Sequence, residues 1–404
     1  MTVVAERVSL VPQNRDERRA LGVACGAHAL HDGYTDLVYL MLPIWQAEFG
    51  LSYAAVGALR TLFSGTMAAL QIPSGLIAEK IGAAPVLAIG TALAGCGYIV
   101  AGTSAGLAML AMALILGGIG ASTQHPLASA LVTHAFAGPR SIKAFGTYNF
   151  AGDMGKMTVP AAGAFLIWLM PWRPAVALLG ACGFAAAIAV FALMPRARGE
   201  AAVHTTSSEA AGTGALGYGF PLLLSVGVID SATRASFLVF LPFVLTAKGA
   251  SVPAIGLALT CIFAGGACGK LACAFIGARI GMFATVVLTE GLTALGMLVL
   301  LPLPLEASYV LLPLLGIALN GTSTVIYGSV PTLVTAAQRS RAFSIFYTGT
   351  IGTGAIAPIL AGFLGDLIGV HQALYVIAAL VLVTLPLALA LRPVLAAAAV
   401  AERA

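Results

Sequence analysis

Charged residues are scarce along this chain. Asp, Glu, Lys and Arg make up 9% of its 404 residues, whereas hydrophobic residues make up 60% and the mean hydropathy is +1.00. A soluble globular domain carries about 25% charged residues, so this chain cannot present a hydrated surface. Lipid is therefore its expected solvent, and the few charges inside apolar segments become the candidates for function.

The apolar residues are grouped in long stretches. About 20 apolar residues cross a hydrocarbon core of about 30 Å as a helix, and the chain has twelve such stretches. They are too long and unbroken for the strands of a barrel. The sequence thus predicts an all-α membrane protein with twelve transmembrane helices. The expected spans are 20–47, 54–78, 84–103, 106–135, 144–169, 173–194, 217–246, 253–277, 282–302, 308–336, 342–368 and 372–391.

Lys and Arg are distributed unequally between the two sides of these spans. With both termini cytoplasmic, fourteen lie in cytoplasmic loops and tails and only Arg173 and Lys248 lie opposite. This bias follows the positive-inside rule. It predicts a multi-pass protein of the bacterial inner (cytoplasmic) membrane, and it explains the net charge of +5 without a nucleic-acid partner. The fourteen are Arg7, Arg15, Arg18, Arg19, Lys80, Arg140, Lys143, Arg196, Arg198, Arg279, Arg339, Arg341, Arg392 and Arg403.

One polar segment divides the spans into two sets of six, and the two sets repeat at an offset of 198 or 199 residues. We expect an N-terminal six-helix half at 1–195, a cytoplasmic linker at 196–216 and a C-terminal six-helix half at 217–404. Secondary transporters use such duplicated halves to alternate access to a central site. Matching segments are Leu42-Pro43 with Leu241-Pro242, Arg140-Ser141 with Arg339-Ser340, and Pro160 with Pro358.

The loop at 75–82 reads GLIAEKIG. It resembles the G-x-x-x-D-R/K-x-G signature of the major facilitator superfamily, with Glu79 in place of Asp. The corresponding loop after the eighth span keeps Arg279 but has Ala278 at the acidic position. The resemblance covers nearly the whole chain and implies the major facilitator fold, with two pseudo-symmetric halves. It also implies a gating role for four residues of the loop, Gly75, Glu79, Lys80 and Gly82.

The fourth and fifth spans carry a narrower resemblance. Residues 118–126 read GIGASTQHP, which is similar to the G-I-G-x-S-x-x-H-P of the fosmidomycin-resistance branch of drug exporters, although Leu127 stands where that branch has an acid. Residues 152–163 read GDMGKMTVPAAG and look like a degraded version of the Gly- and Pro-rich motif of superfamily antiporters. The resemblance implies proton-coupled export, by antiport, of a small anionic or zwitterionic compound.

Span one places His28, Asp32 and Asp36 four residues apart, on one stripe of a helix, with His31 beside them. A carboxyl group at the bilayer centre costs about 3 kcal/mol to insert, so this stripe is not expected to face lipid. We predict Asp32, Asp36 and His31 as the proton-coupling groups. The alternative is that the two acids pair with buried cations and only hold helices together.

Other intramembrane charges have a structural and a functional interpretation. Arg60 can pair with substrate or with a carboxylate, or it can extend to the headgroups. Asp153 and Lys156 are three residues apart, and Asp230 and Arg234 are four apart, so each pair can form within one helix. Within-helix pairing is the favoured interpretation for Asp230 with Arg234, whereas Asp153 and Lys156 are expected at the cavity.

Lys270 has no acid on its own span, so its ammonium group needs either Glu290 of span nine or an anionic substrate. His125 titrates near neutrality if solvated and is expected to line the cavity, with a packed histidine as the alternative. The predicted substrate-contacting residues are Arg60, Gln124, His125, Tyr148, Asn149, Asp153, Lys156, Arg234, Lys270, Asn320, Tyr327 and Tyr347.

Several other functions remain open or disfavoured. Proton-coupled import of an organic anion would use the same residues, and Cys261 with Cys268 could instead serve a copper transporter. A non-transporting sensor or assembly factor is a further alternative. No phosphate-binding loop, nucleotide fingerprint or nucleophile triad stands out, which argues against an enzyme or a primary pump. We expect no cofactor and no metal site, and we expect a monomer that binds a small-molecule substrate, protons and lipid.

Overall fold

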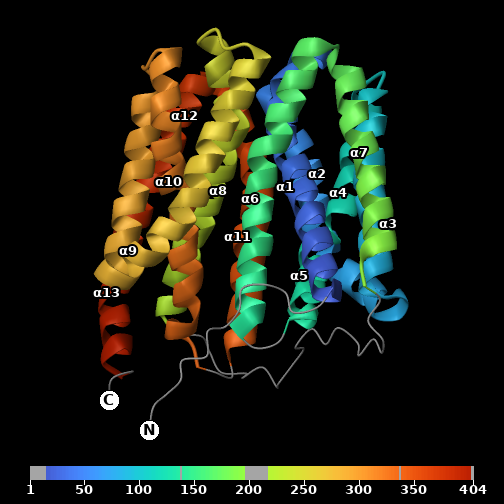
Figure 1. The fold of residues 1–404 in the computed structure, drawn as a ribbon. Helices are drawn as coiled ribbons and strands as arrows, with labels where there is room; N and C mark the ends of the chain where they lie inside the picture. The colour runs from blue at the N-terminus through green and yellow to red at the C-terminus, as the bar shows by residue number, and fades with distance from the viewer. Residues whose placement is uncertain (1–14, 137–138, 196–216, 336–337, 402–404) are drawn as a thin grey trace. The chain divides into compact units, whose positions relative to one another are not determined.

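A computed structural model of the chain describes residues 15–136, 139–195, 217–335 and 338–401, and within these ranges the regular structure is helical (Figure 1). The predicted linker at 196–216 lies outside the described residues. The helices are α1 (Arg15–Phe49), α2 (Tyr53–Ile81), α3 (Ala83–Gly102), α4 (Leu107–Ala121), α5 (Gln124–Ala135), α6 (Pro139–Leu169), α7 (Trp172–Leu193), α8 (Gly219–Ala247), α9 (Val252–Leu300), α10 (Leu305–Ser329), the 3₁₀ helix η1 (Val330–Leu333), α11 (Arg339–Ile368), α12 (Val370–Leu382) and α13 (Thr384–Ala401).

The helical membrane fold is as predicted, but the count of twelve spans is not confirmed directly. Nine helical segments of the described ranges are long and apolar enough to cross a membrane. One of them is α9, whose 49 residues are interrupted by a kink with non-helical backbone at Gly281 and are too many for a single span of about 20 residues. Twelve spans result only if α9 counts as two and if the more polar α1 and α6 are included.

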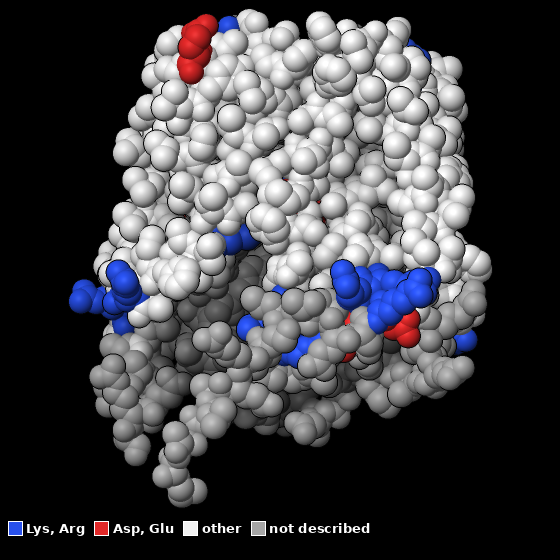
Figure 2. Space-filling view, viewed as in Figure 1, with Lys and Arg blue, Asp and Glu red and all other residues white. Residues whose placement is uncertain are grey.

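The outer faces of the helices carry large apolar side chains. Ile72 is 77% exposed, Phe275 67% and Leu367 81%. On the face shown in Figure 2, few charged side chains interrupt the neutral surface of the described residues. Apolar exposure on this scale would be unfavourable in water, whereas lipid satisfies it. The surface is therefore suited to a bilayer.

The chain forms two compact units. The first consists of residues 1–37 and 62–204, and the second of residues 38–61 and 205–404. Each has its own apolar core, around Leu87 and Leu127 in the first and around Phe220 and Phe346 in the second. The end of α1 and the start of α2 belong to the second unit.

The internal repeat is also present in the backbone. Gly50 and Gly249 have φ of 60° and 88°, and Gly82 and Gly281 have φ of 94° and 81°. Both pairs are 199 residues apart, which is the offset of the repeat in the sequence. Positive φ is readily accessible only to glycine. Each pair therefore marks a chain reversal or helix boundary that the two parts of the sequence share.

Candidate functional site

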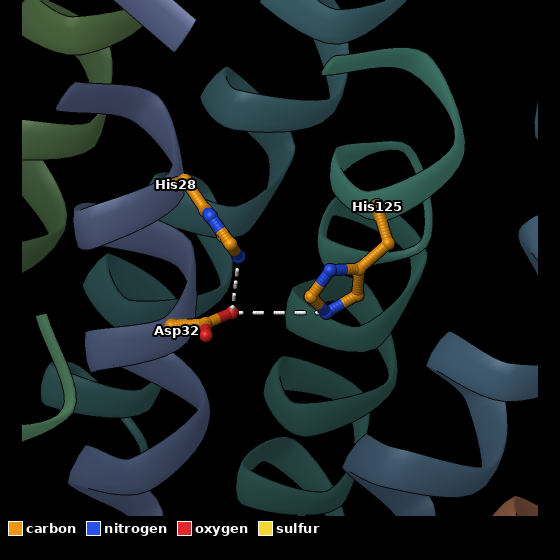
Figure 3. A group of neighbouring side chains, drawn as sticks. All are labelled: His28, Asp32 and His125. Atoms are coloured by element: carbon orange, nitrogen blue, oxygen red, sulfur yellow. Dashed lines mark ion pairs between the residues drawn. The ribbon is translucent and has the colours of Figure 1, made fainter. Parts of the chain in front are cut away.

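The carboxylate of Asp32 contacts three basic side chains in the first unit. Its Oδ1 lies 3.3 Å from Nε2 of His28 and 3.7 Å from Nε2 of His125, as the dashed lines in Figure 3 show. Its Oδ2 lies 3.2 Å from Nζ of Lys156. Helices α1, α5 and α6 supply these groups. We call His28, Asp32, His125, Asp153 and Lys156 the Asp32 cluster.

Two glycines allow α6 to approach α1 closely. A Cβ atom at Gly155 would overlap the carbonyl oxygen of Ala29, and one at Gly152 would meet the side chains of His28 and Asp32. Only residues without a side chain fit at these two positions. The Gly-rich motif of span five thus brings the long side chain of Lys156 within reach of Asp32.

His125 is positioned by a break in the predicted fourth span. Helix α4 ends at Ala121 and α5 begins at Gln124, which places Pro126 in the first turn of α5. Proline is tolerated there, because its missing N–H would have no partner inside the helix. The His125 side chain stays 45% exposed. It is therefore the accessible member of an otherwise largely buried cluster.

The hydrogen bonds of His28 determine how many protons the cluster holds. Nδ1 of His28 donates to the backbone carbonyl of Tyr148 at 2.8 Å, and the two rings stack at 4.0 Å between centroids. A carbonyl oxygen can only accept, and a neutral imidazole has a single N–H. A neutral His28 would therefore point the lone pair of Nε2 at Asp32. Their contact is favourable only with a proton on His28 Nε2 or on Asp32.

Lys156 lies between two carboxylates. Its Nζ is 3.2 Å from Asp32 and 3.6 Å from Oδ1 of Asp153, and Asp36 also acts on it electrostatically. The side chains of Asp32 and Asp153 are only 9% and 12% exposed. Lys156 and the three carboxylates of Asp32, Asp36 and Asp153 together carry an excess negative charge. Protons added to the histidines or to the acids reduce this charge.

Three of the other predicted residues of the first unit have hydrogen-bond partners within the protein, and one is exposed. Nε2 of His31 lies 3.0 Å from the hydroxyl of Thr91 on α3. Nε2 of Gln124 donates to the hydroxyl of Tyr148 at 3.3 Å, and both side chains are almost fully buried. Asn149 is exposed on α6. Gln124 therefore contacts Tyr148, whose ring stacks on that of His28.

Arg60 belongs to the second unit and contacts Tyr39. Its Nη2 donates to the Tyr39 hydroxyl at 3.0 Å, and its guanidinium lies 4.4 Å from the centre of the Tyr39 ring. The side chain is buried, with 8% exposed. A buried Arg over an aromatic face gains a cation–π interaction, so part of its charge is already compensated by the protein.

The predicted residues of α8 and α10 also have protein partners. Nη2 of Arg234 lies 3.8 Å from Oδ2 of Asp230, the within-helix pair that the spacing favours. The Tyr327 hydroxyl shares a 2.7 Å hydrogen bond with Thr350, and its ring lies 4.8 Å from that of the half-exposed Tyr347.

At the α9–α10 contact, Asn320 donates to Gly316 at 3.3 Å, and a Cβ atom at Gly266 would meet its side chain. Lys270 is half-buried on α9.

Glu290 is the main residue that the predicted set lacks. It is 1% exposed and lies against Asp230 rather than facing a lipid-exposed edge. The signal was present in the sequence, because Thr285, Thr289 and Thr293 lie near it at helical spacing. In the structure all three are at most 3% exposed. Four polar residues at such spacing on one apolar helix indicate a buried polar face.

His28, Asp32 and His125 also have the side chains of a metal site. Their ligand atoms lie within 4.8 Å of one another, and imidazole with carboxylate is a common zinc ligand set. Lys156, however, lies 3.2 Å from the same carboxylate and would repel a divalent cation bound there. The arrangement fits a hydrogen-bonded proton site better than a metal centre.

The loop predicted to act as a gate forms the end of α2 and the start of α3. Glu79 and Lys80 are exposed, and Gly82 precedes the first residue of α3. In the second unit, Asp366 of α11 makes a contact that the sequence did not indicate. Its two oxygens accept from the backbone N–H groups of Tyr53 and Ala54, at 2.7 and 2.9 Å, at the start of α2.

A groove of about 500 Å³ runs between α8, α11 and α12 in the second unit. Its lining includes Thr233, Gly349, Leu360 and Val376 and is mainly apolar. None of the predicted site residues lines it. The groove is thus separate from the charged clusters.

Comparison with known proteins agrees with the fold. The sequence model of the Major Facilitator Superfamily matches residues 24–221 and 223–404. The chain belongs to this superfamily. This superfamily consists of membrane transporters. A solved structure of a bacterial homologue of the human lysosomal transporter Spinster, inward-facing and unoccupied, is similar over 94% of this chain and 98% of its own, with a TM-score of 0.81 and 14% identity.

Two curated transporters match parts of this superfamily member. The probable sulfoacetate transporter SauU of Cupriavidus necator is 28% identical over 166 residues, which cover 40% of this chain and 37% of SauU. The drug efflux pump JefA of Mycobacterium tuberculosis is 28% identical over 144 residues, which cover 34% of this chain and 27% of JefA. The chain thus matches less than two-fifths of the length of either relative.

Proposed function

We propose that the protein carries a small organic anion together with a proton across the cytoplasmic membrane of a bacterium. The observation that carries this proposal is that one carboxylate, Asp32, contacts both a site of protonation, His28, and the cation Lys156, at 3.3 and 3.2 Å. Protonation and anion binding are then linked through a single side chain.

The linkage follows from the charges around Lys156. While Asp32 is ionised, it holds the ammonium group of Lys156 together with Asp153, so an incoming anion must compete with both. When Asp32 takes up the proton that it shares with His28, its attraction for Lys156 falls. Lys156 can then form charge-assisted hydrogen bonds with a carboxylate, sulfonate or phosphonate. By reciprocity the bound anion raises the proton affinity by the same factor.

His125 completes this scheme as the accessible group. Its side chain is 45% exposed and its Nε2 lies 3.7 Å from Asp32. A histidine changes its charge near neutral pH when solvated. It can therefore pass a proton between Asp32 and water, and it can donate a hydrogen bond to the substrate. The name of the relative SauU, a sulfoacetate transporter, supports an anionic substrate.

Export by antiport, as the resemblance of spans four and five implies, is the second candidate. A zwitterionic compound would place its ammonium group against Asp32 and Asp153 and would compete there with the proton. Competition at one carboxylate gives exchange, whereas linkage through Lys156 gives cotransport. The name of JefA, a drug efflux pump, supports this alternative.

We further propose that both termini are cytoplasmic, that the protein acts as a monomer, and that the halves 1–195 and 217–404 alternate access as in other members of the superfamily. The charge bias of the loops supports the orientation. The assignments of Asp36 and His31 to proton coupling stay predictions. So do the gating role of the loop at 75–82 and the substrate contacts of Arg60, Gln124, Tyr148, Asn149, Arg234, Lys270, Asn320, Tyr327 and Tyr347.

The test compares Asp32→Asn with wild type in proteoliposomes. A panel of small organic anions that includes sulfoacetate is first screened by the rise in melting temperature that a ligand of the folded state causes. With an anion that binds, we expect Asp32→Asn to keep anion exchange when the anion concentration is equal inside and outside. We expect it to lose anion uptake driven by a pH gradient. Asp16→Asn is the matched control, because it makes the same change in the exposed first turn of α1. Full gradient-driven uptake by Asp32→Asn would refute the proposal.

A further inference from the structure

Two carboxyl groups meet in the interior of the second unit. Asp230 of α8 and Glu290 of α9 are 6% and 1% exposed, and their side chains are in hydrogen-bonding contact. Ionised carboxylates only accept hydrogen bonds. Two of them in direct contact would repel each other and leave the contact without a donor. A proton on one of the two groups removes both problems.

The groups around the pair cannot neutralise it completely. Arg234 lies 3.8 Å from Oδ2 of Asp230, and among the described residues it is the cation that acts on both acids. Helix α10 adds the Thr322 hydroxyl beside Glu290, and Tyr327. Helix α11 adds Tyr347 behind Tyr327. One positive charge therefore faces two acids.

The outer helices supply other titratable groups. Arg392 of α13 lies over the ring of Phe283, and α12 carries His371 and Tyr375. The described ion pairs join none of these three to the two acids.

Polar side chains continue along the buried face of α9 beside Glu290. Thr285, Thr289 and Thr293 are at most 3% exposed, and Thr289 accepts a 2.7 Å hydrogen bond from Thr322. The hydroxyl of Thr293 is buried and has no hydrogen-bond partner among the described residues. Buried polar groups in a membrane helix are costly, and they commonly line proton or substrate pathways. The face is thus more polar than helix packing alone requires.

We propose that Asp230 and Glu290 form a second proton-binding site, which holds one proton shared between the two carboxyl groups. When the proton is bound, the pair and Arg234 are together neutral. When it leaves to water, one negative charge remains, and the two side chains must separate or recruit a new donor. The site lies in a different unit from the Asp32 cluster. Its proton binding does not depend on the proposed transport mechanism.

The test is infrared spectroscopy of the purified full-length protein across a range of pH. A protonated carboxyl group has a C=O stretch distinct from that of a carboxylate. We expect wild type to show a protonated band that Glu290→Gln loses, because glutamine donates to Asp230 without a titrating proton. Glu306→Gln makes the same change at an exposed position of α10 and should keep the band.

A second variant, Asp230→Asn, tests the proposal if Glu290→Gln does not fold. Asp230→Asn should abolish the band or shift its frequency, since it leaves Arg234 facing a single acid and replaces the carboxylate that Glu290 contacts by an amide. The band should persist in Asp32→Asn, so a failure of the proposed transport mechanism is distinguishable from a failure of this site. A band that is unchanged in frequency and intensity in both Glu290→Gln and Asp230→Asn would overturn the proposal.

Discussion

At the residue scale, His28 determines the chemistry of the Asp32 cluster. Its Nδ1 donates to the Tyr148 carbonyl, so its contact with Asp32 is favourable only when a proton lies on Nε2 or on the carboxyl group. Lys156 adds a permanent positive charge on the other carboxylate oxygen. The cluster therefore combines a site for a proton with a positive charge that can bind an anion. The two are coupled because His28 and Lys156 contact the same carboxylate, that of Asp32.

Removal of Lys156 should destabilise the first unit. In Lys156→Met, the largely buried Asp32 and Asp153 lose their shared cation, which we expect to cost about 2–3 kcal/mol, somewhat below the 3–5 kcal/mol typical of a broken buried pair because the histidines can take up protons. Thermal unfolding in detergent measures this loss.

The double variant of Lys156→Met with Asp32→Asn should recover part of that stability, since it removes one uncompensated charge. Lys143→Met is the control, at an exposed position of the same helix. If Lys143→Met and Lys156→Met unfold at the same temperature, Lys156 does not pair with the acids.

The sequence predicted these pairs only where both partners lie on one helix. Helical spacing favoured the pair of Asp230 with Arg234, which is present, and it allowed the contact of Asp153 with Lys156, although these two were expected to face the cavity instead. It could not give the contacts of Asp32 with Lys156, because they depend on how closely α1 and α6 approach. The same limit explains Glu290, which the sequence offered to Lys270 whereas the structure places it against Asp230.

At the scale of elements, glycine positions determine which helices approach. Gly152 and Gly155 bring α6 against α1, and Gly281 interrupts α9 where a loop between two spans was predicted. The twelve apolar stretches were readable from the sequence because lipid imposes a minimum length on a span. The shortness of the connection was not, since only the non-helical backbone at Gly281 separates the two helical parts of α9.

The start of α2 is stabilised by a distant helix. Asp366 accepts from the N–H groups of Tyr53 and Ala54, which have no partners within their own helix, and its charge complements the helix dipole. We expect Asp366→Ala to lower stability by about 1 kcal/mol, the usual value of an N-cap. The test compares the melting temperatures of Asp366→Ala and wild type, with Glu306→Gln as the control. Equal melting temperatures for Asp366→Ala and wild type would show that the contact does not stabilise the protein.

At the scale of the whole molecule, the duplicated sequence predicts that the two halves move as units. The pairs of positive-φ glycines 199 residues apart support a shared origin of the halves. The loop at 75–82 is expected to act on this motion from the cytoplasmic side, although Ala278 in the second copy of the motif lacks the acid. Such a loop can shift the equilibrium only through contacts that differ between states.

Glu79→Ala tests the role of this loop. On a background without native cysteines, we expect this change to raise labelling of a cysteine on the cytoplasmic side of the cavity and to lower it on the outer side. Glu306→Gln serves as the control for removal of an exposed acid. Equal labelling of Glu79→Ala and wild type on both sides would limit the loop to insertion or topology.

The most direct test of the central claim is the sign of proton movement during transport. Wild-type proteoliposomes that contain a pH-sensitive dye are given an inward gradient of a bound organic anion, with no initial pH gradient and with the membrane potential clamped. Linkage of Asp32 and Lys156 predicts that the interior becomes more acidic, because each anion enters with a proton, and that Asp32→Asn abolishes the change. An interior that becomes more alkaline, or a pH that stays constant while the anion enters, would contradict it.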